Sequence, residues 1–258
     1  MRRYCYSYQT VVRYQELITN HHFMLRCQPH EDCGVRILEQ NIDLLSWVNA
    51  NFGVDVFGNK IIYGSMMTPH DIFVVAVNGI VECGGYEEVD PTPSEIYNSF
   101  TTKTQASREI SQFGALTQRV GTPLDQALEL SCRLHSSMSY IPGITSTESS
   151  AAESFSMSAG VCQDFAHLLI SMIRDRGMKA RYVAGFLVGT GETHAWVEVH
   201  SNGVWYGIDP THDRVVDTGY IKISHGRDAG DCSVSRGTHR GSPFHTTEVR
   251  VTVNEIFK

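Results

Sequence analysis

Long apolar runs are missing from this sequence of 258 residues. The longest, residues 71–81, is too short to span a membrane and is interrupted by Asn78-Gly79. The first ten residues contain no apolar segment that would serve as a signal peptide. We therefore expect a soluble cytoplasmic protein without a membrane partner.

Clusters of basic residues are also absent. The chain has 21 Lys and Arg against 28 Asp and Glu, for a net charge of −7. Its densest basic spot is Arg2-Arg3. Such a charge balance argues against non-specific binding of nucleic acid, so we expect no nucleic-acid partner.

Sequence signatures of metals and nucleotides are missing as well. The seven cysteines are odd in number and never spaced as Cys-x-x-Cys, which argues against a disulfide framework and a zinc ribbon. The twelve histidines include no His-Glu-x-x-His, and the chain contains neither Gly-x-Gly-x-x-Gly nor a phosphate-binding P-loop. We expect no metal and no cofactor.

The first ninety residues show strand patterns. Tyr4, Tyr6 and Tyr8 alternate with smaller or polar residues, as in a strand with one aromatic face. Apolar segments flank Gly58-Asn59 and Asn78-Gly79, and both pairs predict hairpin turns. We expect an antiparallel meander or small sandwich over residues 1–92.

After the prolines at 91 and 93 the pattern becomes helical, and we expect a catalytic domain over residues 93–258. Thr122-Pro123 starts one predicted helix, and residues 141–158 are expected to form an irregular loop. A strongly amphipathic helix follows over 161–176 and ends at Gly177. Five predicted strands complete an α+β fold; they cover residues 181–188, 194–200, 204–209, 220–224 and 247–254.

Cys162 stands at the first or second position of this amphipathic helix. Unpaired backbone N–H groups and the helix dipole favour a thiolate there, and the same N–H groups can bind an oxyanion. The other six cysteines are expected to be small, buried structural residues: Cys5, Cys27, Cys33, Cys83, Cys132 and Cys232. Cys162 is the candidate nucleophile.

His194 and Asp209 lie on the two strands of a predicted hairpin. If Asn202-Gly203 forms the turn, Trp196 faces Asp209 and His194 is diagonal to the carboxylate. If Ser201-Asn202 forms it, His194 is directly opposite. Both registers put the two side chains on one face, as a general base and its orienting carboxylate require. A three-residue loop without a compensating bulge would put them on opposite faces.

Other residues fit these roles less well. His167 lies about 140° around the helix from Cys162 and cannot reach the thiol. His200 shares a face with His194 but lies at the turn end of the strand, and His212 is a reserve candidate for the base. Asp164 suits the first turn of a helix on structural grounds alone, so we leave it out of the triad.

At these residues the sequence resembles the bacterial transglutaminase-like superfamily, whose members share a papain-like core. The resemblance is strongest in residues 160–167, 180–186, 193–199 and 208–211, and continues in 226–231 and 236–237. Residues 55–59 resemble part of the β-rich region that precedes this core in many such bacterial proteins. No acidic loop here resembles the calcium site of animal-type transglutaminases.

The resemblance implies a papain-like transglutaminase core, with the helix that bears the cysteine followed by an antiparallel sheet. It also implies that Cys162, His194 and Asp209 form a triad acting on peptide or protein amides through an acyl-thioester. Water would then give hydrolysis, as in a cysteine protease, and an amine would give transamidation. Tyr140 and Ser156 are candidates for the second oxyanion donor.

Two other functions stay open at this point. One is acyl transfer of the arylamine N-acetyltransferase type, which also uses cysteine, histidine and aspartate. The other is a non-catalytic module that only binds peptides. The oligomeric state is not predicted.

Overall fold

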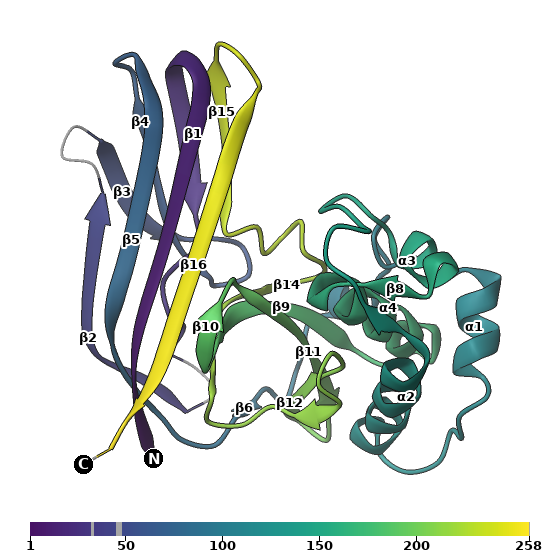
Figure 1. Cartoon of the computed structure of the whole chain (residues 1–258). Coiled ribbons are helices and arrows are strands. Elements are labelled where there is room, and N and C mark those ends of the chain that lie inside the picture. Colours follow the sequence, from purple (N-terminus) through teal and green to yellow (C-terminus); the bar gives the residue numbers. More distant parts are fainter. Residues whose placement is uncertain (32–33, 45–47, 258) are drawn as a thin grey trace.

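One long strand, β1 (Arg2–Leu25), organises a first group of antiparallel strands (Figure 1). The structure, a computed structural model, describes residues 1–31, 34–44 and 48–257. The first half of β1 pairs with β5 and β16, and its second half with β4 and β15; β2 extends the sheet beside β5, and β3 beside β4. The bounds of these strands are β2 (Val35–Leu44), β3 (Asn49–Val54), β4 (Lys60–Met66), β5 (His70–Cys83), β15 (Ser235–Arg240) and β16 (His245–Ile256).

The predicted alternation in β1 is confirmed. Tyr4, Tyr6 and Tyr8 are all buried on one face of the strand. The rings of Tyr6 and Tyr8 stack on Phe186, with centroid distances of 6.0 and 5.5 Å. Since Phe186 belongs to the neighbouring sheet, this aromatic face joins the two parts of the molecule.

Of the two predicted hairpins, one is confirmed and one is wrong. β3 and β4 form an antiparallel pair around the turn at Gly58-Asn59. Asn78-Gly79, however, lies inside β5, which runs on between β1 and β2. A Cβ at Gly79 would lie 2.0 Å from the carbonyl oxygen of Glu39, next to an irregularity in β2. Glycine here permits close approach of a neighbouring strand rather than a turn.

A second sheet and a group of helices form the rest of the molecule (Figure 1). This sheet has the order β13-β12-β11-β9-β14, with β6 beside β12, and all its pairs are antiparallel. Its strands are β6 (Glu87–Val89), β9 (Ala180–Leu187), β11 (His194–Ser201), β12 (Val204–Asp209), β13 (Arg214–Val215) and β14 (Tyr220–Gly226). Two short strands, β7 (Ser139–Tyr140) and β8 (Ala159–Gly160), pair in parallel, and β10 (Gly189–Gly191) pairs with β16.

The helices cover one side of this second sheet, with α4 against β9 and β11. They are α1 (Arg108–Gly114), α2 (Pro123–Ser137), α3 (Ala151–Met157) and α4 (Cys162–Asp175), with a 3-10 turn η1 (Glu95–Asn98). Strands make up 48% of the structure and helices 19%, so the predicted α+β fold is strand-rich. None of the described helices is long and apolar enough to span a membrane.

The predicted start of α2 and the predicted end of α4 are confirmed. Thr122 and Asp125 form a reciprocal capping box at the start of α2, and Gly177 follows α4 with φ of 75°. The irregular loop expected over 141–158 is wrong in its second half, which forms α3. Its signal is a second capping box, in which Ser150 and Glu153 bond each other's backbone.

The last predicted strand exists, but its partner differs from our expectation. β16 pairs with β1 over Arg3–Tyr14 rather than joining the sheet of β9 and β11. Its alternate residues Val251 and Val253 are buried in the same core as α4. The C-terminal strands thus lie in the sheet of the N-terminal region, although the alternation of their residues specified only a strand. The division at residues 92 and 93 stays a prediction.

Candidate active site

Cys162 is the first residue of α4, after the extended residue Val161. The N–H groups of the first helical turn have no partner within the helix. The Cys162 side chain is partly buried and lines a cleft that also contains His194. The thiol therefore lies beside backbone groups that are able to donate to an oxyanion.

Asp164 holds this helix start in place. Its buried carboxylate accepts hydrogen bonds from the backbone N–H of Val161 at 2.8 Å, from Thr145 at 2.6 Å and from Ser154 at 2.7 Å. A Cβ at Gly160 would lie 2.6 Å from this carboxylate, which explains the glycine before the helix. Asp164 thus joins α3, the preceding loop and α4, as its exclusion from the triad anticipated.

The hairpin of β11 and β12 has the first of the two predicted registers. Val197 pairs with Ile208 and Ser201 with Val204, so Asn202-Gly203 forms the turn. His194 is therefore diagonal to Asp209, and its Nε2 lies 2.8 Å from the Asp209 Oδ2. Since Nε2 bonds the carboxylate, Nδ1 is the ring nitrogen left for the thiol.

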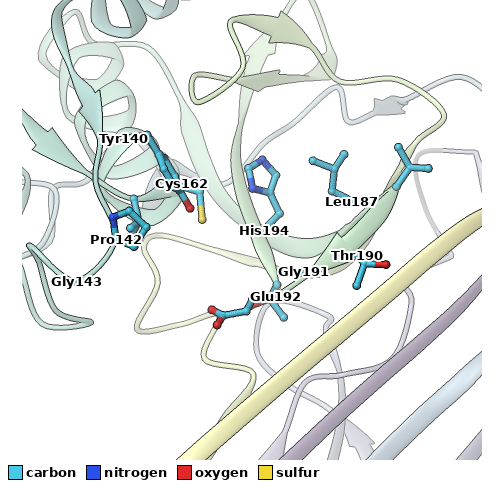
Figure 2. A pocket seen from close by; sticks show the side chains of 12 residues that line it. Tyr140, Pro142, Gly143, Cys162, Leu187, Thr190, Gly191, Glu192 and His194 are labelled. Carbon is cyan, nitrogen blue, oxygen red and sulfur yellow. The ribbon is translucent and has the colours of Figure 1, made fainter.

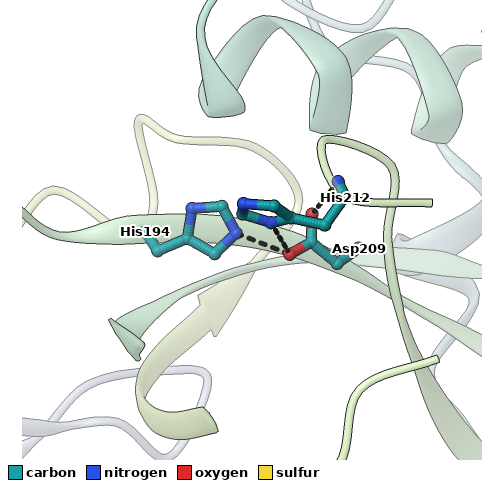
Figure 3. Close-up of side chains that lie close together, drawn as sticks. All are labelled: His194, Asp209 and His212. Carbon is teal, nitrogen blue, oxygen red and sulfur yellow. Dashed lines mark hydrogen bonds and ion pairs between the residues drawn. The ribbon is translucent and has the colours of Figure 1, made fainter. Parts of the chain in front are cut away.

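Asp209 is fully buried and accepts hydrogen bonds from several directions (Figure 3). Oδ2 accepts from His194, from the Nδ1 of His212 at 2.7 Å and from the hydroxyl of Tyr220 at 2.6 Å. Oδ1 accepts from the backbone N–H of Thr211 at 2.9 Å and of His212 at 3.3 Å. Burial alone would raise the pKa of Asp209, but these bonds outweigh it and hold the pKa well below its usual range.

The cleft has a volume of about 570 Å³, and the Cys162 sulfur and the His194 ring project into it (Figure 2). Burial lowers the pKa of His194, but hydrogen bonds and negative charge from Asp209 and Cys162 raise it to about 9. The imidazole is therefore protonated at neutral pH. The remaining lining residues are Tyr140, Pro142, Gly143, Val161, Leu187, Val188, Thr190, Gly191, Glu192 and Thr193.

Comparison with protein families agrees with this geometry. Residues 112–210 match the family described as "Transglutaminase-like superfamily", and residues 4–82 match the "Bacterial transglutaminase-like N-terminal region". This chain belongs to the transglutaminase-like superfamily. Cys162, His194 and Asp209 all lie within the part that matches the transglutaminase-like core.

The transglutaminase-like chain is also similar to uncharacterized mycobacterial proteins. It is 26% identical to one from Mycobacterium leprae, over 90% of this chain and 91% of the relative. It is 27% identical to one from Mycobacterium tuberculosis strain H37Rv, over 91% of this chain and 87% of the relative. A crystal structure from Cytophaga hutchinsonii, named a "putative cysteine protease", superposes with a TM-score of 0.83 at 18% identity; the match covers 100% of this chain and 91% of that one. It shares the fold.

A hydrogen-bonded chain lies behind His194 in this transglutaminase-like core. The Trp196 ring stacks on His194, with centroids 6.3 Å apart, and its Nε1 donates to the hydroxyl of Tyr86 at 2.7 Å. Tyr86 in turn donates to the buried carboxylate of Glu198 at 2.7 Å. Arg181 and Lys222 form ion pairs with Glu198. This buried network orients the indole against which the imidazole packs.

The three other histidines considered for the role of base all have partners other than the thiol. His167 and His200 lie away from Cys162 as expected, and His212 contacts the proposed triad through Asp209. His167 is buried and accepts a hydrogen bond from the backbone N–H of Ala229 at 3.1 Å. Burial lowers the pKa of His167 to about 4, so it stays neutral. His200 bonds the carbonyl of Asp90 at the far end of β11. His212 bonds Asp209 rather than Cys162.

The two candidates for a second oxyanion donor separate clearly. Tyr140 lines the cleft next to Cys162 (Figure 2). Ser156 is exposed on α3 and donates to the carbonyl of Glu153 at 2.7 Å. Tyr140 thus stays a candidate, whereas Ser156 is bonded within its own helix.

The residues that sequence reasoning missed are Tyr220 and Tyr86. Both hydroxyls are brought to the site by tertiary packing, from β14 and from the segment before β6. Neither tyrosine stands in a spacing that indicates a contact with Asp209 or Trp196. A contact between distant strands leaves no such local signal.

One group of metal-ligand side chains exists among the described residues: His194, Asp209 and His212, whose ligand atoms lie within 4.8 Å of one another. Imidazole and carboxylate are donors that suit zinc. In this structure, however, both imidazoles bond the same carboxylate oxygen, and Tyr220 bonds it too. A metal held by this group would replace those bonds and take His194 away from the thiol.

Proposed function

We propose that this chain is a thiol-dependent enzyme that cleaves or transfers peptide or protein amides through an acyl-thioester on Cys162. One observation carries the proposal. The His194 imidazole, bonded to a buried carboxylate through Nε2, shares a cleft with a thiol at a helix N-terminus. This combination meets the geometric requirements of a nucleophile, a general base and an orienting group.

In the proposed reaction the proton shared by Cys162 and His194 lies on Nδ1 of the imidazole, and the thiolate sulfur attacks the carbonyl carbon of the amide. The resulting oxyanion accepts from the backbone N–H of Cys162, and the Tyr140 hydroxyl is the candidate for a second donor. The intermediate collapses as His194 protonates the departing amine, which leaves an acyl-thioester. Water or a second amine, deprotonated by His194, then takes the acyl group and regenerates the thiol.

The edge of β10 supports a peptide as the substrate. Thr190 and Gly191 of this strand line the cleft, and in the described part of the chain only β16 pairs with β10. An extended peptide beside Cys162 would thus find a strand edge with unpaired backbone groups.

The test is to trap the acyl-enzyme. The protein is incubated with a peptide library, quenched in acid and digested, and adducts on Cys162 are identified by mass spectrometry. We expect acylation of Cys162 in the wild type and none in His194→Ala. Acylation by an acyl-CoA but by no peptide would favour the arylamine N-acetyltransferase type of reaction instead.

Alkylation by iodoacetamide at neutral pH provides a second measurement. We expect Cys162 to react faster than a free thiol and His194→Ala to remove this advantage. Glutathione serves as the free-thiol reference. Cys132 is unsuitable for this, because it is exposed on α2 rather than buried as expected, and Asp213 raises its pKa. Cys27, Cys83 and Cys232 are buried as expected, Cys5 is partly buried, and Cys33 lies outside the described residues. Equal rates for Cys162 and glutathione would argue for a module that only binds peptides.

A further inference from the structure

The cleft at Cys162 continues into a second hollow. A groove of about 600 Å³ runs along the first sheet, lined by residues of β1 and β16 that include Arg13, Glu248 and Arg250. Glu192 lines both the cleft and this groove. Glu192 therefore lies at the junction of the two hollows, where a peptide bound at the thiol would extend from the cleft into the groove.

Glu192 is also the one acidic residue among the described residues that line the cleft. Of the described lining residues other than Cys162 and His194, it alone carries a charge; the others are apolar, glycine, tyrosine or threonine. In the adjoining groove, by contrast, Arg13 and Arg250 balance Glu192 and Glu248. A substrate side chain near the thiol thus meets an excess of negative charge from this one carboxylate.

The orientation of Glu192 fits a role toward a ligand. It is exposed, and Figure 2 shows its carboxylate pointing across the cleft toward the side where Pro142 and Gly143 lie. Within the described residues, no ion pair includes Glu192. The negative charge of Glu192 also acts on Tyr140 in the same cleft: burial, Cys162 and Glu192 together raise the pKa of Tyr140.

Glu192 is separate from the acid–base machinery, although it stands only two residues before His194. The ring of His194 interacts with Asp209 and Cys162. The carboxylate is therefore available to a group that enters from solvent.

We propose that Glu192 forms a subsite for a positively charged side chain, lysine or arginine, next to the amide bond that Cys162 attacks. The proposal rests on the function proposed above and names the substrate class: peptides that are basic beside the reacting bond. A carboxylate pairs with ammonium or guanidinium and repels an acidic side chain. Since Glu192 is exposed, we expect a preference of about fivefold.

The first test compares three peptides that acylate Cys162 and differ at one flanking residue, which is Lys, Gln or Glu. We expect kcat/KM of the wild type to be about fivefold higher for Lys than for Gln at low salt, and lower still for Glu. The preference should weaken at high ionic strength, since salt screens exposed charges. It should vanish in Glu192→Gln and reverse in Glu192→Lys. Glu248→Gln, which removes the same charge from the groove alone, should retain it.

The second test needs no turnover. Cys162 is labelled with two methanethiosulfonates, one carrying a trimethylammonium group and one a sulfonate, and the site is read by mass spectrometry. We expect the ratio of the cationic to the anionic rate to fall about fivefold in Glu192→Gln and to hold in Glu248→Gln.

The outcomes distinguish the two proposals. A ratio that shifts in Glu192→Gln while no peptide acylates Cys162 supports the cationic subsite and contradicts the proposed amide chemistry. Peptide turnover with the same charge preference in the wild type and Glu192→Gln overturns the subsite and leaves the proposed function intact.

Discussion

The hydroxyl of Tyr220 donates a 2.6 Å hydrogen bond to the Asp209 oxygen that also bonds His194. The Nε of Arg214 donates to the same hydroxyl at 2.7 Å. Asp209 is therefore held by Tyr220 of β14, which lies two strands beyond β11 in the sheet, as well as by His194, so the carboxylate has little freedom to rotate. Tyr220 thus helps to orient His194, because it fixes the carboxylate to which the His194 imidazole is bonded.

Tyr220→Phe tests that arrangement. The change removes one hydroxyl and keeps the ring, so we expect the rate of Cys162 acylation to fall about tenfold because Asp209 is less firmly oriented. Loss of a hydrogen bond to a charged group should lower the free energy of unfolding by about 2 kcal/mol. Tyr63→Phe, at an exposed site on β4, is the control and should leave both quantities unchanged. An unaltered acylation rate in Tyr220→Phe would contradict the orienting role.

The pH dependence of the reaction follows from His194. Its pKa of about 9 means that the imidazole holds a proton at neutral pH and loses it as the pH rises through that value. We expect kcat/KM for a peptide that acylates Cys162 to decrease above about pH 9, because the departing amine then lacks its proton donor. A rate that still rises at pH 10 would exclude His194 as the general acid.

Thermal stability should change over a related pH range. The pKa of His194 is raised on folding from 6.5 to about 9, so its contribution is complete below pH 6.5 and is lost as the pH rises through 9. We expect the Tm of the wild type to fall between pH 7 and 9 more than that of His194→Gln. Equal falls in the two proteins would contradict the raised pKa.

The buried ion pairs of the second sheet predict a large mutational cost. Lys222 is fully buried and contacts the carboxylates of Glu198 and Glu88. Lys222→Met should lower the free energy of unfolding by about 3 kcal/mol, because it leaves buried negative charge less well compensated. Arg36→Met, which removes the exposed ion pair with Glu82, should cost less than about 1 kcal/mol. Similar costs in denaturant titrations would show that the network is not effectively buried.

The last strand should matter to the site. Val253 on β16 is fully buried in the core shared with α4, whereas Asn254 is exposed. Val253→Asp should lower the free energy of unfolding by more than about 3 kcal/mol, and Asn254→Asp by less than about 0.5. Circular dichroism and Cys162 alkylation should report one shared transition. Two separate transitions would mean that the second sheet folds independently of β16.

Local pattern was sufficient for the elements that carry the proposed chemistry. The amphipathic period of α4, the glycine after it and the Asn202-Gly203 turn are short-range features, and the structure has all three. Because side chains alternate along a strand, the turn alone put His194 and Asp209 on one face. Their hydrogen bond follows from that register.

Partners between distant segments were decided by tertiary structure alone. Asn78-Gly79 has the local chemistry of a turn, yet the close approach of β2 makes Gly79 part of a continuous strand. β16 has the alternation of any half-buried strand, and packing of Val251 and Val253 selected β1 as its partner.

The candidate site divides in the same way. The sequence by itself determined the cysteine at a helix start and the pairing of His194 with Asp209, since helix ends and hairpins are local structures. Only the tertiary structure brought Tyr220 to Asp209, Tyr86 to Trp196, and Glu192 to the junction of cleft and groove. Those contacts join segments from separate parts of the chain, and their energies depend on burial that exists only in the folded molecule.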